Sequence, residues 1–483
     1  MVDKNSIILK TSEYYKENGI ILPKISELAN PSSINKDTQK NLKLINKDSA
    51  DPKNLFRIHW HNNMNHSCFL ETPEHIVLTP EFTGVDAKII VNIGRLFPLI
   101  AAHKVLAAYA CLVPRLVRGE FDFTKHKAVW PSTGNYCRGG VAISKILGCR
   151  SVAILPEGMS KERFNWLEKW VTDQQDIIKT PGTESNVKEI YDACNILAKD
   201  PTNIIINQFS EYDNYSIHRA VTGPAFEKSF NEVKGSSNLK ARFYVAASGS
   251  SGTLAAGDYL KQSLGAGIAV VEATECPTLL YNGYGEHNIQ GIGDKHVPLI
   301  QNVMNTDFVV GISDKATNNL NLLFNTEIGQ GYLIKKKGLS EKLVNRLPEF
   351  GLSSIANILA SIKLAKYMKL GSDDAIITVA TDGADLYLTE LDKTKKEFIG
   401  SYGDITCAEF FGQYIKAIST EDMIELNQRD KERIFNLGYY TWVEQQGIEL
   451  NDFEIRRDQN FWNNHLKNFL KIDSTIDQFN NAA

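Results

Sequence analysis

Short apolar runs alternate with longer segments of helical period between about residue 76 and residue 392. The runs are rich in β-branched residues, which is typical of buried strands. Strands are expected at 88–93, 127–130, 151–156, 203–209, 242–247, 268–273, 307–312 and 375–380, and helices at 136–147, 160–170, 184–199, 253–264 and 352–369. Strands that alternate with helices are joined by crossovers, which build a mostly parallel sheet covered on both faces. The pattern predicts an α/β fold that binds ligands beyond the carboxyl ends of its strands.

The two ends of the chain have a different texture. Residues 1–75 are polar, rich in Lys and Asn, and show only a short helical stretch near 8–18. We expect them to form an extension that packs onto the core or stays partly mobile. Residues 393–483 have the pattern of helices with aromatic faces. The sequence therefore predicts a core at 76–392 between an N-terminal extension and a mainly helical C-terminal region.

The composition excludes several classes of protein. With 43% hydrophobic and 10% aromatic residues among 483, global disorder is not expected. The formal charge of −4 gives no pull toward nucleic acid or an acidic membrane. The longest apolar run, at 96–117, is interrupted by His103 and Lys104, so it predicts a buried helix rather than a membrane span. Seven scattered cysteines without a C-x-x-C pair, and no secretory signal, predict a cytoplasmic protein.

Lys104 is the first residue that could carry chemistry. It lies in IAAHKVLAAY, a segment that is otherwise built to be buried. A lysine in apolar surroundings is costly unless it is neutral, paired or covalently used. A neutral amine is nucleophilic and suits Schiff-base formation with an aldehyde. The alternative is a lysine whose stem is buried and whose ammonium reaches solvent.

Two loops between a strand and a helix are candidates for anion binding. PSTGN (131–135) and ASGSSGTLAAG (247–257) carry small residues where backbone N–H groups are exposed at a helix start. The second loop fits neither the P-loop nor a strict G-x-G-x-x-G pattern, so phosphate binding outside those nucleotide motifs is favoured. An ordinary N-cap and a tight turn without ligand are the alternatives.

Together these features have the order and spacing of the fold-type II pyridoxal-phosphate enzymes. The sequence resembles the cysteine synthase and cystathionine β-synthase family over roughly residues 79–392. Besides STGN, the segments that resemble the family are LPEGMSKERFNWLEKW (155–170), NQFSEYDNYSIHRAVTGPAFE (207–227), VVEATECP (270–277), GEHNIQGIGDKHVP (285–298), ISDKAT (312–317) and GLSSIANILASIKLAKYM (351–368).

The resemblance implies a two-lobed fold like that of the tryptophan synthase β subunit, with a smaller mobile lobe at about 105–211 and pyridoxal 5′-phosphate as cofactor. It implies that Lys104 forms the internal aldimine and that Asn135 contacts the phenolic oxygen of the cofactor. The phosphate would be held by Gly249, Ser250, Ser251, Gly252 and Thr253. The substrate carboxylate would be held by Ser132, Thr133 and Gln208, with Gly291 approaching the substrate.

The chain also departs from the family. The usual S-V-K is replaced by A-H-K, which places His103 next to the Schiff-base lysine. The family places a neutral Ser or Thr at the pyridine nitrogen, whereas ATDGAD (380–385) offers Thr381 or Asp382 and leaves the choice open. A carboxylate there would keep the ring protonated and stabilise carbanions more strongly.

Asp294, in GIGDKHVP, follows a glycine-rich turn that would face the site. A carboxylate there could act as a general base on water or on an incoming nucleophile. A loop aspartate that caps backbone amides is the alternative. The histidines at 59, 61, 66 and 75 lack the Cys or carboxylate spacing of a recognised metal site, so we expect no metal.

The resemblance implies β-replacement on an amino acid with a β-leaving group, such as serine or O-acetylserine with sulfide or a thiol, through an aminoacrylate. Two alternatives stay open. One is β-elimination by a cysteine lyase or desulfhydrase, which Asp294 and the altered lysine neighbourhood favour. The other is a non-catalytic protein that binds the cofactor and serves a partner. A homodimer is the usual state of the family, and a small amino acid is the expected substrate.

Overall fold

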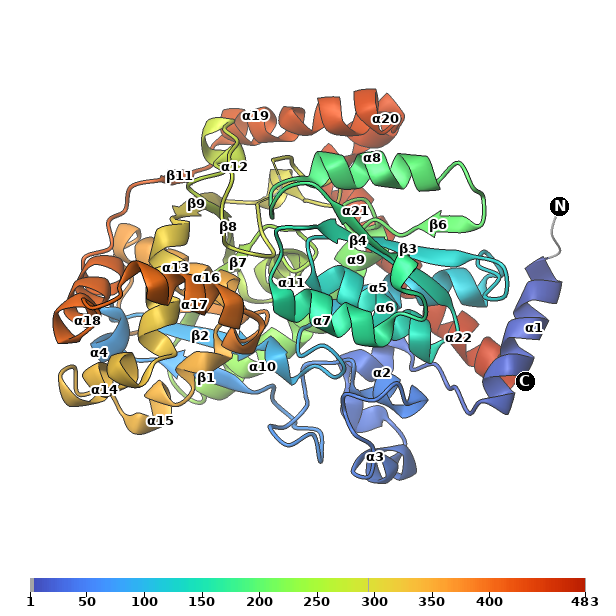
Figure 1. Ribbon diagram of the computed structural model, residues 1–483, viewed down its shortest axis with the longest axis horizontal. Coiled ribbons are helices and arrows are strands. Elements are labelled where there is room, and N and C mark those ends of the chain that lie inside the picture. Colours follow the sequence, from blue (N-terminus) through green and yellow to red (C-terminus); the bar gives the residue numbers. More distant parts are fainter. Residues whose placement is uncertain (1–3, 294, 483) are drawn as a thin grey trace.

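The computed structural model describes residues 4–293 and 295–482, which form helices around two sheets (Figure 1). The larger sheet has the order β1-β2-β10-β7-β8-β9-β11. From β2 to β9 neighbouring strands run parallel, and the edge strands β1 and β11 run antiparallel to their neighbours. These strands are β1 (His75–Leu78), β2 (Lys88–Ile93), β7 (Lys240–Ala247), β8 (Gly267–Ala273), β9 (Phe308–Ile312), β10 (Asp374–Ala380) and β11 (Met423–Glu425).

The smaller sheet is parallel and has the order β5-β4-β3-β6. Its strands are β3 (Lys127–Pro131), β4 (Arg150–Pro156), β5 (Ile177–Thr180) and β6 (Asn203–Ile205). The predicted α/β fold with parallel sheets covered by helices is therefore confirmed.

The helices between residues 75 and 400 lie around these sheets, some on the sheet faces and others, such as α14 and α15, packed on neighbouring helices. They are α4 (Pro80–Thr83), α5 (Lys104–Val117), α6 (Asn135–Ile146), α7 (Lys161–Trp170), α8 (Val187–Leu197), α9 (Tyr212–Ile217), α10 (Gly223–Lys234), α11 (Ala255–Leu264), α12 (Thr278–Tyr281), α13 (Asp314–Phe324), α14 (Glu327–Lys335), α15 (Glu341–Val344), α16 (Leu352–Tyr367) and α17 (Leu388–Glu397). Among the described residues, no helix is long and apolar enough to cross a membrane.

Both faces of the larger sheet are buried, which explains why its strands are apolar without alternation. In β7, Tyr244 and Ala246 belong to the core that contains α5 and α11, whereas Phe243 and Val245 belong to the core that contains α16. Successive side chains of a strand point to opposite faces, so a strand covered on both sides must be apolar at nearly every position.

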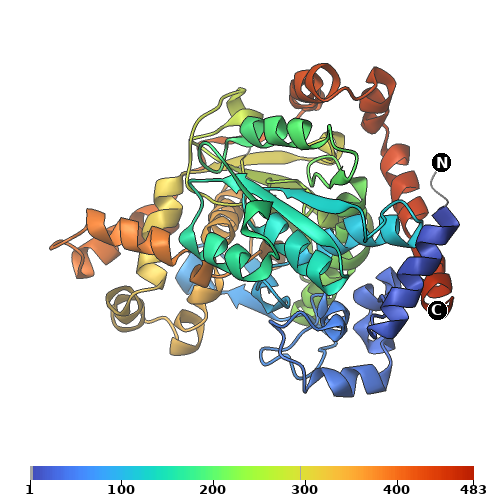
Figure 2. The same cartoon turned by 45° about the vertical axis from the view of Figure 1, so that its right-hand side comes forward.

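The N-terminal segment packs onto the core. Its helices are α1 (Lys4–Glu17), α2 (Ile25–Ala29) and α3 (Lys36–Leu42), and the C-terminal helices are α18 (Asp404–Phe410), α19 (Gln428–Tyr439), α20 (Leu450–Glu454), α21 (Gln459–Phe469) and α22 (Ile472–Asn481). Figure 2 shows α1 and α2 beside the end of the chain. Tyr15 and Phe479 share one core with α5, and Asn480 hydrogen-bonds both backbone groups of Leu22. The domain boundaries proposed from the sequence stay a prediction, because the terminal segments and the middle share this core.

Three histidines of the N-terminal segment are buried. His59, His61 and His66 are at most 8% exposed. Burial lowers the pKa of His61 and of His66 to about 4, so both rings are neutral at neutral pH. Among residues 4–293 and 295–482, no group of three or more His, Cys, Asp or Glu side chains is arranged to hold a metal ion.

We expect acid to destabilise the protein through these rings. A histidine whose pKa falls on folding stabilises the protein above its unfolded pKa of about 6.5, and that stability is lost as the pH falls toward the folded value of about 4. At pH 5, His66 alone should cost about 2 kcal/mol relative to pH 7.5. His66→Gln removes the titrating ring, so its melting temperature should fall less between pH 7.5 and pH 5 than that of the wild type. Equal falls would contradict this assignment.

Candidate active site

A cavity lies beyond the carboxyl ends of β3, β7 and β10, where the sequence predicts the site. Its walls come from the loops that follow these strands and from the start of α5. The lining residues are His103, Lys104, Ser132, Thr133, Asn135, Tyr136, Gln208, Ala247, Gly249, Ser250, Ser251, Thr253, Gln290, Gly291, Ile292, Ser353, Thr381 and Asp382. Nearly every residue proposed from the sequence is therefore brought to one place.

Lys104 is the first residue of α5 and its side chain is half-buried. Its Nζ donates to Gln208 Oε1 at 3.1 Å and to Ser250 Oγ at 3.0 Å. Because Lys104 lies at the N-terminus of α5, the positive end of the helix dipole disfavours the protonated form of its amine. The amine therefore points into the cavity rather than to solvent, as the nucleophile hypothesis requires and the alternative of an exposed ammonium does not.

Gln208 connects Lys104 to the STGN loop. Its Oε1 accepts from Lys104, and its Nε2 donates to Ser132 Oγ at 3.2 Å. Asn214 holds this arrangement from behind, because its Nδ2 donates to the Gln208 carbonyl at 3.0 Å and to Ser250 Oγ at 3.2 Å. Thr133 lies next to Ser132 on the same wall and is 5% exposed.

The loop before α11 is shaped to receive an anion. Among the described residues, the backbone N–H groups of Gly249, Ser250, Ser251 and Thr253 donate no hydrogen bond to protein. A Cβ at position 249 would come within 2.3 Å of the Gly291 carbonyl oxygen, and one at 252 within 2.3 Å of Asn214 Oδ1. N–H groups at a helix start that the protein leaves unused are typical of a phosphate site. Gly252 itself lies behind the wall rather than in the lining.

Asn135 is oriented by charged neighbours on both sides. Its Oδ1 accepts from Arg138 Nη1 at 2.9 Å, and its Nδ2 donates to Asp382 Oδ2 at 2.6 Å. Tyr387 also donates to this carboxylate, at 2.8 Å. Burial raises the pKa of Asp382, against the effect of Arg163 and of the hydrogen bonds from Tyr387 and Asn135. Burial and Arg163 lower the pKa of Arg138 to about 10.

Thr381 and Asp382 occupy different places in the cavity. Thr381 Oγ1 lies 2.9 Å from Ser353 Oγ, and both residues line the wall. Asp382 instead contacts Asn135 and Tyr387. Of the two candidates for contact with the ring nitrogen, Thr381 therefore belongs to a pair of hydroxyl groups, and Asp382 belongs to a buried network of charged side chains.

His103 is a part of the site that departs from the family pattern. Its Nε2 lies 2.9 Å from Thr253 Oγ1, and its ring stacks on Trp60 at 6.0 Å between centroids. Burial and the charge of Lys104 lower the pKa of His103 to about 3, so the ring is neutral at neutral pH.

Several positioning residues were missed from the sequence. Asn214 and Arg138 contact the predicted residues from behind, and Ser353 pairs with Thr381. Asn214 lies in the quoted segment 207–227, seven residues after the start of its NQF motif, so its place in that segment was an available signal. Asp294, proposed as a general base, lies outside the described residues. Burial raises the pKa of Cys137 to about 12, so its thiol stays protonated.

These residues fit pyridoxal phosphate. The unused N–H groups of the 249–253 loop suit the phosphate, the Lys104 amine suits the aldehyde, and the Thr381–Ser353 pair and Asn135 suit the polar atoms of the ring. The acceptor-free N–H groups are the observation that carries the fit, because buried donors are paired in folded proteins unless a ligand takes them.

Gly249→Ala should prevent the loop from closing on a phosphate. The added Cβ meets a backbone oxygen, which cannot rotate away as a flexible side chain would. We expect the dissociation constant of pyridoxal phosphate to rise at least about tenfold, measured by absorbance titration. Gly331→Ala is the control, since a Cβ there meets nothing within 4 Å. Unchanged affinity in Gly249→Ala would place the phosphate elsewhere.

No protein-family model matches the chain. Cysteine synthase B of Campylobacter jejuni is 29% identical over 257 residues, which cover 52% of this chain and 75% of that protein. A probable cysteine synthase of Bacillus subtilis is 27% identical over 261 residues, covering 54% of this chain and 75% of the relative.

Solved structures show the same fold. Cysteine synthase of Entamoeba histolytica superposes with a TM-score of 0.55 at 21% identity, covering 71% of this chain and 93% of that one. A hydrogen sulfide-producing enzyme of Fusobacterium nucleatum gives 0.53 at 22% identity, covering 73% and 95%. From this fold, these relatives and the geometry of the cavity, we conclude that the chain is a fold-type II pyridoxal-phosphate enzyme related to the cysteine synthases.

Proposed function

We propose that the chain catalyses β-replacement on an amino acid with a β-leaving group, such as O-acetylserine or serine, with sulfide or a thiol as the nucleophile. The observation that carries the proposal is the Lys104 amine, which lies within 3.1 Å of Gln208 and Ser250 in a cavity shared with the unused N–H groups of the 249–253 loop. The similarity to cysteine synthases supports this reaction class.

Pyridoxal phosphate, when bound, supplies the electron sink for the bond changes at Cα and Cβ. Lys104 would hold the cofactor, and its Nζ, when free, would accept the Cα proton. Ser132, Thr133 and Gln208 would bind the substrate carboxylate, since their side chains lie on one wall beside Lys104. Holding the carboxylate fixes which Cα bond faces the amine, and this orientation decides whether the proton is lost.

Contacts at the far wall support a role for each of its residues. Thr381, paired with Ser353, is proposed to face the ring nitrogen with a neutral hydroxyl. Asp382 is proposed to orient Asn135, whose amide would reach the phenolic oxygen. Beside a neutral hydroxyl the ring nitrogen is not kept protonated, so the ring would withdraw electrons less strongly than beside a carboxylate. This suits loss of a β-substituent over reactions that pass through a longer-lived carbanion.

β-Elimination is a second candidate. Solved structures with this fold include hydrogen sulfide-producing enzymes, one of them described with an α-aminoacrylate intermediate. Replacement and elimination share every step up to loss of the β-substituent, so the same residues serve both. The amount of pyruvate relative to cysteine or thioether from one substrate separates them.

The assembly and the location of the protein are also proposals. We expect a homodimer in the cytoplasm, acting on a small amino acid. Mass measurement in solution tests the dimer.

Holoprotein given O-acetylserine and sulfide should form cysteine, and Lys104→Ala should reduce the rate at least about a thousandfold, because the proton-transfer group and the cofactor attachment are lost together. The measurements are cysteine formation and the absorbance change on adding each amino acid. If the cofactor-loaded protein reacts with no β-substituted amino acid, that result would contradict the proposal and favour a non-catalytic role.

Ser132→Ala should weaken substrate binding more than turnover. Ser132 Oγ accepts from Gly134 N–H and from Gln208, so its loss removes a carboxylate contact and loosens the loop. We expect KM for the amino acid to rise about tenfold with a smaller change in kcat. A fall in kcat with unchanged KM would instead assign Ser132 to the chemical step.

A further inference from the structure

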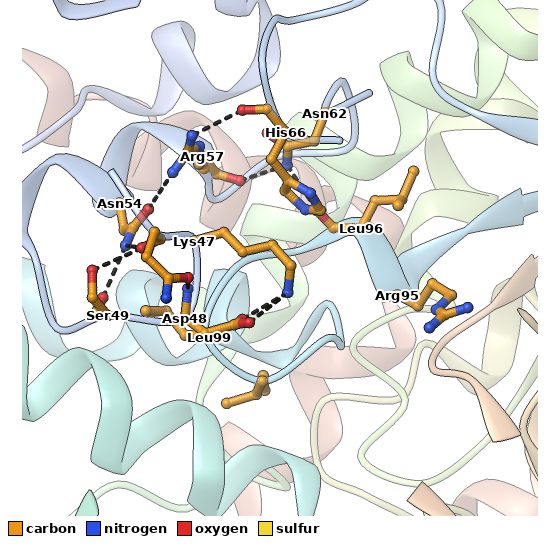
Figure 3. A network of polar contacts seen from close by, with 12 residues as sticks. Lys47, Asp48, Ser49, Asn54, Arg57, Asn62, His66, Arg95, Leu96 and Leu99 are labelled. Carbon is orange, nitrogen blue, oxygen red and sulfur yellow. Dashed lines mark hydrogen bonds and ion pairs between the residues drawn. The ribbon is translucent and has the colours of Figure 1, made fainter. Parts of the chain in front are cut away.

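A polar network joins the N-terminal segment to the loop that precedes Lys104 (Figure 3). We call residues 42–66 the clamp and residues 94–103 the lysine loop. The lysine loop connects the end of β2 to the start of α5. Because α5 begins at Lys104 itself, the end of this loop decides where the amine points.

The lysine loop is held in a backbone conformation that its residues do not favour. Leu99 has φ 72° and Ala101 has φ 51°. L-residues other than glycine, asparagine and aspartate rarely adopt positive φ, and they keep it only where the surrounding structure imposes it. Something must therefore hold this loop three residues before the catalytic amine.

The clamp holds the loop through its backbone. The Leu96 carbonyl accepts from Asn62 Nδ2 at 3.1 Å and lies 2.8 Å from His66 Nε2. Since a carbonyl only accepts, His66 Nε2 carries the proton. The N–H of Leu99, the first residue with positive φ, donates to the Lys47 carbonyl at 3.0 Å. The backbone is thus tied to the N-terminal segment just before the strained residues and at the first of them.

Arg57 joins the parts of the clamp. It is 2% exposed, and its guanidinium donates to the carbonyls of Ile45, Leu42 and His66 and to Asn54 Oδ1. One buried side chain therefore connects the stretch that carries Lys47 to the turn that carries His66. Removal of one donor or acceptor in such a buried network leaves its partner unsatisfied.

The opposite side of the lysine loop contacts the active site. Arg138 Nη2 donates to the Ile100 carbonyl at 3.2 Å, and Arg138 Nη1 donates to Asn135 Oδ1. Trp166 Nε1 donates to the Leu99 carbonyl at 3.2 Å. A shift of the loop would therefore move Lys104 and release the residue that orients Asn135.

We propose that the clamp positions Lys104 for cofactor attachment, with His66 and Asn62 as its positioning residues. The inference rests on the assignment of Lys104 as the attachment site within the proposed function. It gives the N-terminal extension a role in the site, although no residue of the clamp lines the cavity. Loosening the clamp lets Leu99 and Ala101 relax to negative φ, and the amine then meets the cofactor aldehyde less often.

The test compares two substitutions of His66. His66→Asn tolerates the positive φ of this position (55°) but is too short to reach Leu96. His66→Gln accepts this φ less readily than asparagine but can place an amide N–H where Nε2 lies, so retained affinity in this variant would come from the restored hydrogen bond. We expect His66→Asn to raise the dissociation constant of pyridoxal phosphate about tenfold and to slow borohydride-trapped attachment at Lys104, with His66→Gln within about twofold of wild type. Asn65→Ala, an exposed asparagine of the same turn, is the control.

A second variant acts on the loop itself. Ala101→Val leaves the clamp intact but adds a β-branched side chain at φ 51°, so the loop should relax and lose cofactor affinity in the same way. If His66→Asn does not fold, this variant carries the test. The proposal is overturned if the folded variants keep wild-type affinity and attachment rate while only the melting temperature falls.

These readouts concern cofactor attachment and not turnover. Wild-type protein that attaches the cofactor at Lys104 but converts no amino acid would sink the proposed reaction and leave the role of the clamp intact. Normal turnover of the wild type together with unchanged cofactor attachment in both variants would overturn the role of the clamp and leave the proposed reaction intact.

Discussion

The placement of one amine is the constraint on which the site depends. Lys104 Nζ is held between Gln208 and Ser250, which come from different parts of the chain. Gln208 also contacts the STGN loop, and Ser250 belongs to the loop before α11, so the amine links the wall proposed for the substrate to the wall proposed for the phosphate. A nucleophilic amine has to meet a bound aldehyde in a near-attack geometry, and small displacements reduce its rate steeply. Much of the surrounding structure serves this placement.

The two walls meet through close backbone contact. Gly249 lies against the Gly291 carbonyl with no room for a Cβ, and Gly293 N–H donates to the Ser248 carbonyl at 2.8 Å. The loop proposed to bind the phosphate and the loop proposed to approach the substrate are therefore in contact, so a shift of one would move the other. Glycine is needed here because of this proximity rather than because of its flexibility.

Buried charge surrounds the site without entering a simple ion pair. Asp382 shares its surroundings with Arg138 and Arg163, and these groups are joined through Asn135 and Tyr387. The hydrogen bonds of this network impose a specific arrangement on the side chains that they join. The orientation of the Asn135 amide is a consequence of this network.

The sequence by itself predicted the class of fold from its strand pattern and the cofactor from its resemblance to a known family, and it named most of the residues that line the cavity. Its longer strands are apolar because both faces are buried, and its loops carry glycine and hydroxyl residues at fixed places next to helices. It missed β1, β5 and β11, which are short edge strands of three or four residues with partly exposed side chains and therefore lack a continuous apolar run.

Only the tertiary structure decided which of Thr381 and Asp382 joins the charge network, and it alone brought the N-terminal segment against the lysine loop. Adjacent positions can point into different surroundings, and a contact across about 30 to 50 residues depends on backbone carbonyls, which every residue carries and no sequence pattern can reveal.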